Sequence, residues 1–253
     1  MKLFKIVSGV TLASLFVVSG ALSGCASASD GAEPASANQS GWEVLDDTSQ
    51  PLELCIPPRS DVFSTVTVAN GPFGTWPSCP EYCPAGSYVY EAFTQHEANQ
   101  GSGDDTALNG IWLVCRTADS GNFAKVIKSK IGSWGSKPLF GDGSNDLSRY
   151  QRCTPQQVNN VIIGAQMKIE GALSSGDDTA ANQLTVRCLD RSTIAVKPQP
   201  TNWGSLTPEI QCPNGKAVCG LRTRVENSQG SGDDTALNGL QLVCCKFPYV
   251  VPG

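Results

Sequence analysis

Acidic residues at regularly repeated positions are the side chains of this 253-residue chain best suited to chemistry. Three segments share the order Gly-Asp-Asp-Thr-Ala, and a glutamate precedes the first aspartate of each by seven residues. The three acidic triplets are Glu97/Asp104/Asp105, Glu170/Asp177/Asp178 and Glu226/Asp233/Asp234. Two carboxylates about 5 to 9.5 Å apart, one with a raised pKa, could serve as acid and base or nucleophile in glycoside transfer.

Two other interpretations of the triplets need no catalysis. Their oxygens could surround a calcium ion, which prefers carboxylate ligands. Alternatively, the aspartates accept backbone N–H bonds in a tight turn that opens the next strand, with the threonine and asparagine of the motif helping. We favour the structural interpretation, because the pattern occurs three times and a catalytic pair is needed once. We therefore assign no catalytic residue, no metal and no cofactor.

The composition excludes several classes of function. The chain has a single histidine, His96, so a zinc site rich in histidine cannot form and any catalytic triad would have to include this residue. A net charge of −5 argues against nucleic acid as a partner, since that requires clustered Lys and Arg. We expect His96 to be a buried, hydrogen-bonded residue, because it occupies the place of Ile169 and Val225 in the other two repeats.

Tryptophan is the second residue type that could contact a ligand. Trp76, Trp134 and Trp203 lie beside glycine or a small residue upstream of each repeat, where packing is the more common role. Trp112 differs, because its neighbours in the strand face inward and the other repeats have polar residues at its position. It is the candidate exposed aromatic contact.

The first residues are predicted to direct export. Residues 1–24 have a basic start, a short apolar run and a small-residue end, as in a signal peptide. The end resembles a bacterial lipobox, which predicts lipid attachment at Cys25, although cleavage after Ala26-Ser27-Ala28 is the alternative. Residues 25–50 are rich in Ala, Ser, Asp and Gln and are predicted to form a flexible tether.

The cysteines predict a disulfide framework. The chain has 11 cysteines, and removing Cys25 from the folded domain leaves an even set suited to an oxidising compartment. Adjacent cysteines in a strand point to opposite faces and need different partners. The pairs predicted from the repeated unit are Cys83–Cys115, Cys153–Cys188, Cys212–Cys244 and Cys219–Cys245, and the exchanged order of the last two stays open. Cys55–Cys79 completes the even set.

Alternating apolar and polar residues predict strands on both sides of each motif. After the third motif, Leu240, Leu242 and Cys244 alternate with Gln241 and Val243, and the first two repeats show the same spacing. The domain 51–253 is therefore predicted to be all-β, with repeats at about 60–116, 126–189 and 196–247. Three sheets that each bury one face would close into a prism around a common core.

The repeated Gly-Asp-Asp-Thr-Ala-Leu-Asn-Gly resembles the vitelline membrane outer layer protein I family, as do Cys219-Gly220-Leu221-Arg222 and the terminal Cys244-Cys245-Lys246. The resemblance covers about residues 60 to 247. It implies a type I β-prism of three Greek-key sheets with pseudo-threefold symmetry, in secreted, disulfide-bonded proteins of egg envelopes and other extracellular layers. This chain departs from the family pattern in three ways: it has the extra Cys55 and Cys79, an insertion around residues 137–152, and Ala181 and Gln183 in place of the Leu and Gly of the second motif.

Three functional hypotheses follow. The first is a secreted or envelope-attached structural or binding module associated with carbohydrate, with glycans, extracellular matrix or cell wall as partners. The second is a glycosyl transferase or hydrolase acting on N-acetylglucosamine oligosaccharides, an activity class to which the resembled family has been linked. The third is a stable exported scaffold without a ligand. Contact with a membrane is expected only through a lipid on Cys25.

Overall fold

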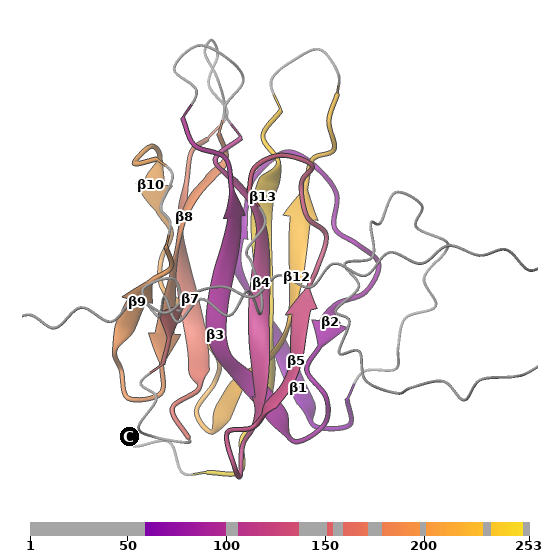
Figure 1. The fold of residues 1–253 in the computed structure, drawn as a ribbon, viewed down its shortest axis with the longest axis vertical. Helices are drawn as coiled ribbons and strands as arrows, with labels where there is room; N and C mark the ends of the chain where they lie inside the picture. The colour runs from indigo at the N-terminus through magenta and orange to yellow at the C-terminus, as the bar shows by residue number, and fades with distance from the viewer. Residues whose placement is uncertain are drawn as a thin grey trace, which may run out of the picture. The chain divides into compact units, whose positions relative to one another are not determined.

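The protein is described by a computed structural model over residues 59–99, 106–136, 151–153, 159–171, 179–197, 201–229 and 234–249. Throughout these ranges the regular elements are strands, and no helix that could cross a membrane occurs in them. The strands form three antiparallel sheets that face a common interior (Figure 1). The predicted all-β prism is confirmed.

The three sheets are named here after their central strand pairs. The β3–β4 sheet contains, in spatial order, β5 (Phe123–Lys128), β4 (Leu108–Thr117), β3 (Ser87–His96) and β6 (Gln151–Arg152). The β7–β8 sheet contains β10 (Ser205–Leu206), β7 (Ile162–Ile169), β8 (Ala181–Cys188) and β9 (Thr193–Ala195), with β11 (Ile210–Gln211) also paired to β7. The β12–β13 sheet contains β1 (Val62–Asn70), β13 (Leu237–Lys246), β12 (Lys216–Val225) and β2 (Glu81–Tyr82).

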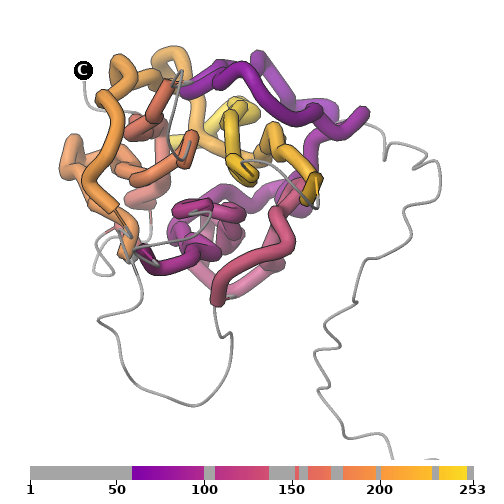
Figure 2. The backbone as a smooth tube through the Cα atoms, turned by 90° about the horizontal axis from the view of Figure 1, so that it is seen from above, coloured from indigo at the N-terminus to yellow at the C-terminus, as the bar shows by residue number. Residues whose placement is uncertain are grey.

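The β12–β13 sheet joins the two ends of the described chain. Strand β1 pairs with β13 from Val62 opposite Cys245 to Asn70 opposite Gly239, so the earliest described strand lies beside the last one (Figure 2). Strand β2 covers the other side of β12. The sheets therefore do not coincide with the sequence units 60–116, 126–189 and 196–247. Strands that precede each central hairpin pair with a different sheet: β1 and β2 with the β12–β13 sheet, β6 with the β3–β4 sheet, and β10 and β11 with the β7–β8 sheet.

The core follows the alternation seen in the sequence. Leu240, Leu242 and Cys244 of β13 are buried in one cluster to which all three sheets contribute. The same cluster contains the matching residues of the other repeats, Ile111, Leu113, Cys115, Leu184, Val186 and Cys188. Burying these side chains stabilises the fold by roughly 25 cal/mol for each Å² of apolar surface removed from water. Burial of one face of each sheet is thus the main force that closes the prism.

A second apolar cluster lies on the other face of the same strands. Cys245 belongs to it, together with Cys219 and Val243, whereas Cys244 belongs to the first cluster. The ring of Phe247 packs edge-on against that of Tyr88, with centroids 4.9 Å apart. Neighbouring cysteines on one strand therefore serve two different cores.

The disulfides connect these strands at the places predicted from the repeats. The bonds in the structure are Cys83–Cys115, Cys153–Cys188, Cys212–Cys244 and Cys219–Cys245. The alternative order of the last two pairs does not occur. Cys79 is also disulfide-bonded, while Cys55 and Cys25 lie outside the described residues.

Gly135 occupies a position that only glycine can fill. Its φ is +80°, in the left-handed region, and a Cβ there would stand 2.2 Å from the carbonyl oxygen of His96. Gly204 and Gly74 make the same approach to the strand ends at Ile169 and Val225. The returning chain can therefore close onto each hairpin only through glycine.

Replacing Gly135 with alanine is predicted to destabilise the fold more than the same change at Gly86. Gly86 also has positive φ, +75°, but a Cβ there would meet nothing within 4 Å. Gly86→Ala should cost about 1–2 kcal/mol from the backbone alone. Gly135→Ala adds a steric clash with the strand, so its melting temperature, measured by circular dichroism, should be the lower of the two. Equal melting temperatures would contradict this account of the close approach.

Candidate functional site

Glu97 uses its carboxylate to hold the start of strand β4. Its Oε2 accepts a hydrogen bond from the Thr106 hydroxyl at 2.7 Å and a longer one from the Thr106 N–H at 3.4 Å. The Thr106 hydroxyl in turn accepts a bond from Asn109 Nδ2 at 2.6 Å. We call this chain of contacts the Glu–Thr–Asn clasp.

The same clasp occurs in the other two sheets. Glu170 Oε2 and Glu226 Oε2 each accept the hydroxyl of a threonine at 2.7 Å, from Thr179 and Thr235 respectively. Asn182 and Asn238 complete these clasps, with Nδ2 to threonine Oγ1 distances of 2.7 and 2.5 Å. The three threonines and three asparagines are almost completely buried. One local design therefore closes all three central hairpins.

Each clasp holds an alanine in the left-handed backbone region. Ala107, Ala180 and Ala236 have φ values of 47°, 47° and 45°. This region costs a residue with a Cβ about 1–2 kcal/mol. The backbone carbonyl of each alanine accepts the N–H of the clasp glutamate, for example from Glu97 at 2.8 Å. The surrounding hydrogen bonds therefore stabilise a conformation that the chain would otherwise avoid.

The asparagine of each clasp also binds the returning chain. Asn109 Oδ1 accepts the Trp134 N–H at 3.3 Å, and Asn238 Oδ1 accepts the Phe73 N–H at the same distance. In the second sheet, Asn182 Oδ1 accepts the hydroxyl of Thr201. Phe73, followed by Gly74, thus takes the place that Trp134 takes before Gly135. Trp76, which the sequence pattern put in this group, lies elsewhere on the sheet with Arg222 5.7 Å from its ring.

The described acidic candidates all have structural contacts. Glu97, Glu170 and Glu226 belong to clasps in three different sheets. Asp234 is buried, and its Oδ1 accepts the Gln229 N–H at 2.8 Å. The other candidates, Asp104, Asp105, Asp177, Asp178 and Asp233, lie outside the described residues. Among the residues that the structure does describe, no group of three or more His, Cys, Asp or Glu side chains is arranged to hold a metal ion.

Trp112 is less exposed than the sequence pattern predicts. It lies in the middle of β4 and is partly buried. Lys128, its cross-strand partner in β5, places its ammonium 4.9 Å from the ring centroid. This cation–π contact covers part of the aromatic surface that a ligand would need. Among Trp76, Trp112, Trp134 and Trp203, the last is the most exposed, at 39%.

His96 differs from the buried, hydrogen-bonded residue that was expected. It ends β3 and is only partly buried, and its Nδ1 atom is buried without a hydrogen-bond partner among the described residues. Burial lowers the pKa of His96 below its ordinary value of 6.5. The imidazole therefore stays neutral near pH 7 and favours folding in that form.

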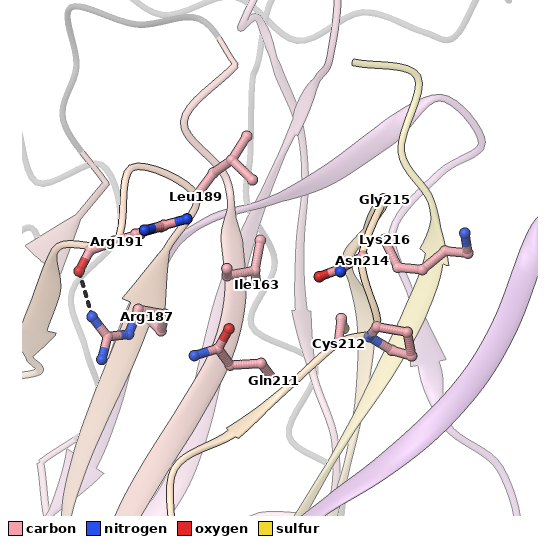
Figure 3. Close-up of a pocket in the computed structure, with 10 residues that line it drawn as sticks. Ile163, Arg187, Leu189, Arg191, Gln211, Cys212, Asn214, Gly215 and Lys216 are labelled. Carbon is pink, nitrogen blue, oxygen red and sulfur yellow. Dashed lines mark hydrogen bonds between the residues drawn. The ribbon is translucent and has the colours of Figure 1, made fainter. Parts of the chain in front are cut away.

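An open cavity of about 390 Å³ lies between the β7–β8 sheet and the turn that leads into β12 (Figure 3). Its lining residues come from β7, β8, the β8–β9 turn, β11 and the 213–216 turn. They are Ile163, Arg187, Leu189, Arg191, Gln211, Cys212, Pro213, Asn214, Gly215 and Lys216. Sequence reasoning missed this site, because its residues lie outside the repeated motif and come from two sheets. In the sequence, the basic residues Arg187, Arg191 and Lys216 follow no regular spacing that would have grouped them into a site.

Comparison with known proteins gives consistent results. Residues 64–247 match the family described as vitelline membrane outer layer protein I (VOMI). The chain is 35% identical over 182 residues to the human protein named vitelline membrane outer layer protein 1 homolog, covering 70% of this chain and 80% of that protein. It is 36% identical over 200 residues to the mouse homolog, covering 77% and 88%.

Solved structures that align with this chain include lectins. A mannose-binding lectin from Champedak aligns with a TM-score of 0.42 at 12% identity, over 74% of this chain and 99% of the lectin. Artocarpin in complex with Me-alpha-mannose aligns with a TM-score of 0.43 at 15% identity, over the same shares.

Thr106→Val is predicted to destabilise the protein by about 1–3 kcal/mol, because it leaves the half-buried carboxylate of Glu97 and the buried amide of Asn109 without the hydroxyl between them. Thr117→Val serves as the matched control, since the contacts of the Thr117 hydroxyl with the Ser120 hydroxyl and the Asn122 N–H are both exposed and can be replaced by water. That change should stay within about 0.5 kcal/mol. Thermal unfolding of the oxidised proteins measures both. If Thr106→Val melts with the control, the clasp does not stabilise the fold.

His96 is predicted to make the folded state less stable on mild acidification. Its pKa is lower in the folded than in the unfolded chain, so the unfolded chain binds more protons as the pH falls below 6.5. Its contribution is complete above that pH and is lost on acidification toward the folded pKa. The change in melting temperature from about pH 7.5 to about pH 5.5 should therefore be smaller in His96→Gln. An identical pH dependence in both proteins would show that His96 contributes nothing.

Proposed function

Because the chain belongs to the vitelline membrane outer layer protein I family, we propose that it is an exported, disulfide-locked module of an extracellular layer that associates with carbohydrate. The observation that carries this proposal is an open cavity set in a frame closed by covalent bonds. Family membership supports the extracellular setting, since the human and mouse relatives are named for the outer layer of the vitelline membrane.

The disulfides support export to an oxidising compartment. Structural disulfides persist outside the cytosol, where thiols are not kept reduced. Here they link the central strands to segments that enter each sheet, as Cys83 does with Cys115 and Cys212 with Cys244. On the chain-entropy model, a loop of about 30 residues closed in this way contributes roughly 3–4 kcal/mol. A module built so would persist in an extracellular layer without other support.

The cavity supports carbohydrate as the ligand class. Its inner surface contains the buried apolar side chains of Ile163 and Leu189, and its sides carry the amides of Gln211 and Asn214 (Figure 3). A sugar ring has apolar C–H faces and hydroxyl edges, so such a mixture suits it. The volume of about 390 Å³ lies within the range of about 300–1,000 Å³ found for small-ligand sites.

The described residues give no comparable support to glycosyl transfer. That reaction needs two carboxylates on either side of the bond that is cleaved. None of the residues lining the cavity is acidic, and the described glutamates of the repeated motif are engaged in clasps. We therefore propose binding without catalysis.

The proposal also includes the route to the cell exterior. Residues 1–24 would act as the export signal, Cys25 as a lipid-attachment site, and residues 25–50 as a tether to the domain. With such an anchor the module would stay at the cell envelope. With cleavage after Ala28 it would be released.

The purified domain is predicted to be retained by at least one insoluble polysaccharide, such as chitin or peptidoglycan, or by a glycan array. Protein that has been reduced and alkylated is the control, because it keeps the composition and loses the cavity. Retention of the native domain alone supports the proposal. Failure of the native domain to bind any of these glycans would overturn the carbohydrate assignment.

A further inference from the structure

The cavity carries positive charge in a chain whose net charge is −5. Three of its ten lining residues are basic and none is acidic. Arg187 and Arg191 lie on one side, on the β7–β8 sheet and its turn, and Lys216 lies on the other side, at the start of β12 (Figure 3). The Arg191 side chain points into the cavity, whereas the charged ends of Arg187 and Lys216 point outward at its two sides (Figure 3).

Hydrogen bonds from three of its guanidinium nitrogens hold Arg187 in place. Its Nε and Nη2 donate to the two carboxylate oxygens of Glu209 at 2.9 and 2.6 Å, and Nη1 donates to the carbonyl of Arg191. The hydrogen bond to Arg187 lowers the pKa of Glu209, so the pair stays ionised at neutral pH. A guanidinium has five N–H donors. Two of those on Arg187 have no partner among the described residues.

Glu209 also positions the amide of Gln211. The Gln211 Nε2 donates to Glu209 Oε1 at 2.5 Å. Glu209 does not line the cavity, but its carboxylate orients two residues that do and offsets part of the positive charge of Arg187. Arg191 and Lys216 therefore supply most of the net positive charge of the cavity.

Arg191 is directed to the cavity by an unusual backbone conformation. Its φ is 69°, which makes it the only non-glycine residue with positive φ in the described ranges apart from the three clasp alanines. Its N–H donates to the Cys188 carbonyl at 2.9 Å, and its own carbonyl accepts from Arg187. Figure 3 shows its side chain extending toward Leu189. Backbone strain of this kind often accompanies ligand sites.

Lys216 supplies charge from the opposite side. Its ammonium lies 4.6 Å from the centroid of the Phe63 ring, and no ion pair to it occurs within the described residues. The neighbouring turn at Asn214 and Gly215 is open, since a Cβ on Gly215 would meet nothing within 4 Å. A ligand can therefore approach this side of the cavity without displacing protein atoms.

From these contacts we infer that the cavity binds a sugar unit that carries an anionic group, a carboxylate or a sulfate. The anionic group lies beside Arg191, whose side chain extends into the cavity, with Arg187 and Lys216 adding positive charge at its two sides, and the sugar ring covers Ile163 and Leu189. Charge-assisted hydrogen bonds from guanidinium groups fix the orientation of such an anion. This inference rests on the proposed carbohydrate function and names the chemical class of its ligand.

Isothermal titration calorimetry of the native domain tests the inference with four ligands. Trigalacturonic acid and a heparin tetrasaccharide carry carboxylates or sulfates, the methyl ester of trigalacturonic acid is the neutral match, and a short poly-glutamate peptide is acidic without sugar. Binding of one acidic saccharide, much weaker binding of the methyl ester and the peptide, and weakening by salt are expected. Binding of trigalacturonic acid shows that a carboxylate is sufficient, whereas binding of the heparin tetrasaccharide alone, which carries both carboxylates and sulfates, identifies sulfate as the recognised group.

Variants place the binding in the cavity. Lys216→Gln and Arg191→Asn each remove one charge, and asparagine tolerates the left-handed backbone at residue 191. Each should weaken binding roughly threefold to fivefold, as for partly exposed ion pairs. The double variant should weaken it more than either alone. Lys197→Gln, an exposed lysine that does not line the cavity, is the control of equal charge and should bind as the native domain does. Unchanged melting temperatures verify that the variants are folded.

Other outcomes separate the two levels of the proposal. Acidic saccharides that bind all variants equally, or a methyl ester that binds as tightly as the acid, would overturn the cavity inference and leave carbohydrate association intact. Equal binding of poly-glutamate would overturn the assignment to a sugar. Failure of all saccharides here, together with failure of every polysaccharide in the retention test, would overturn both.

Discussion

The Glu–Thr–Asn clasp is the interaction on which the closed prism depends. Each central hairpin must pass through an alanine in the left-handed region, which is unfavourable for any residue with a Cβ. The clasp glutamate and threonine hold the two strand ends together, and the asparagine then binds the chain that returns to that sheet. Without this set of bonds, the hairpin end and the returning segment would both lose their position. The threonines and asparagines of the clasps are buried, so breaking one of these bonds would leave a polar group that water cannot reach, at a large cost in free energy.

The clasps also connect the sheets to one another. Gly132 lies between Asn109 of one clasp and Ala236 of another, where an added Cβ would stand 2.6 Å from Asn109 Oδ1 and 3.1 Å from the Ala236 Cβ. The β1–β13 pairing then joins the beginning of the described chain to its end. Disulfides add covalent links between the same strands. Local turn geometry, sheet closure and cross-linking therefore all favour the same structure.

This frame leaves ligand recognition to segments outside the repeat. The residues of the repeated motif that the structure describes are engaged in holding the fold, and Trp112 is partly covered by Lys128. The cavity is built instead from Arg187, Arg191 and Lys216, which lie where two sheets and their turns meet. A repeated scaffold can vary such segments without disturbing the core, because they do not take part in the clasps.

The sequence alone determined the strands, the buried face and the pairs Cys83–Cys115 and Cys153–Cys188, because alternation and cysteine spacing are local patterns that burial of one sheet face requires. The order of the four cysteines in the third repeat was decided only by the structure, which pairs Cys212 with Cys244 and Cys219 with Cys245. It also favoured a structural role for the repeated acidic residues, and the contacts of Glu97, Glu170, Glu226 and Asp234 agree with that role. Only the tertiary structure decided which segment completes each sheet, so that Phe73 replaced Trp76 beside the third clasp. The cavity likewise became visible only in three dimensions, because its charges come from positions that are brought together by the packing of two sheets and follow no spacing along the chain.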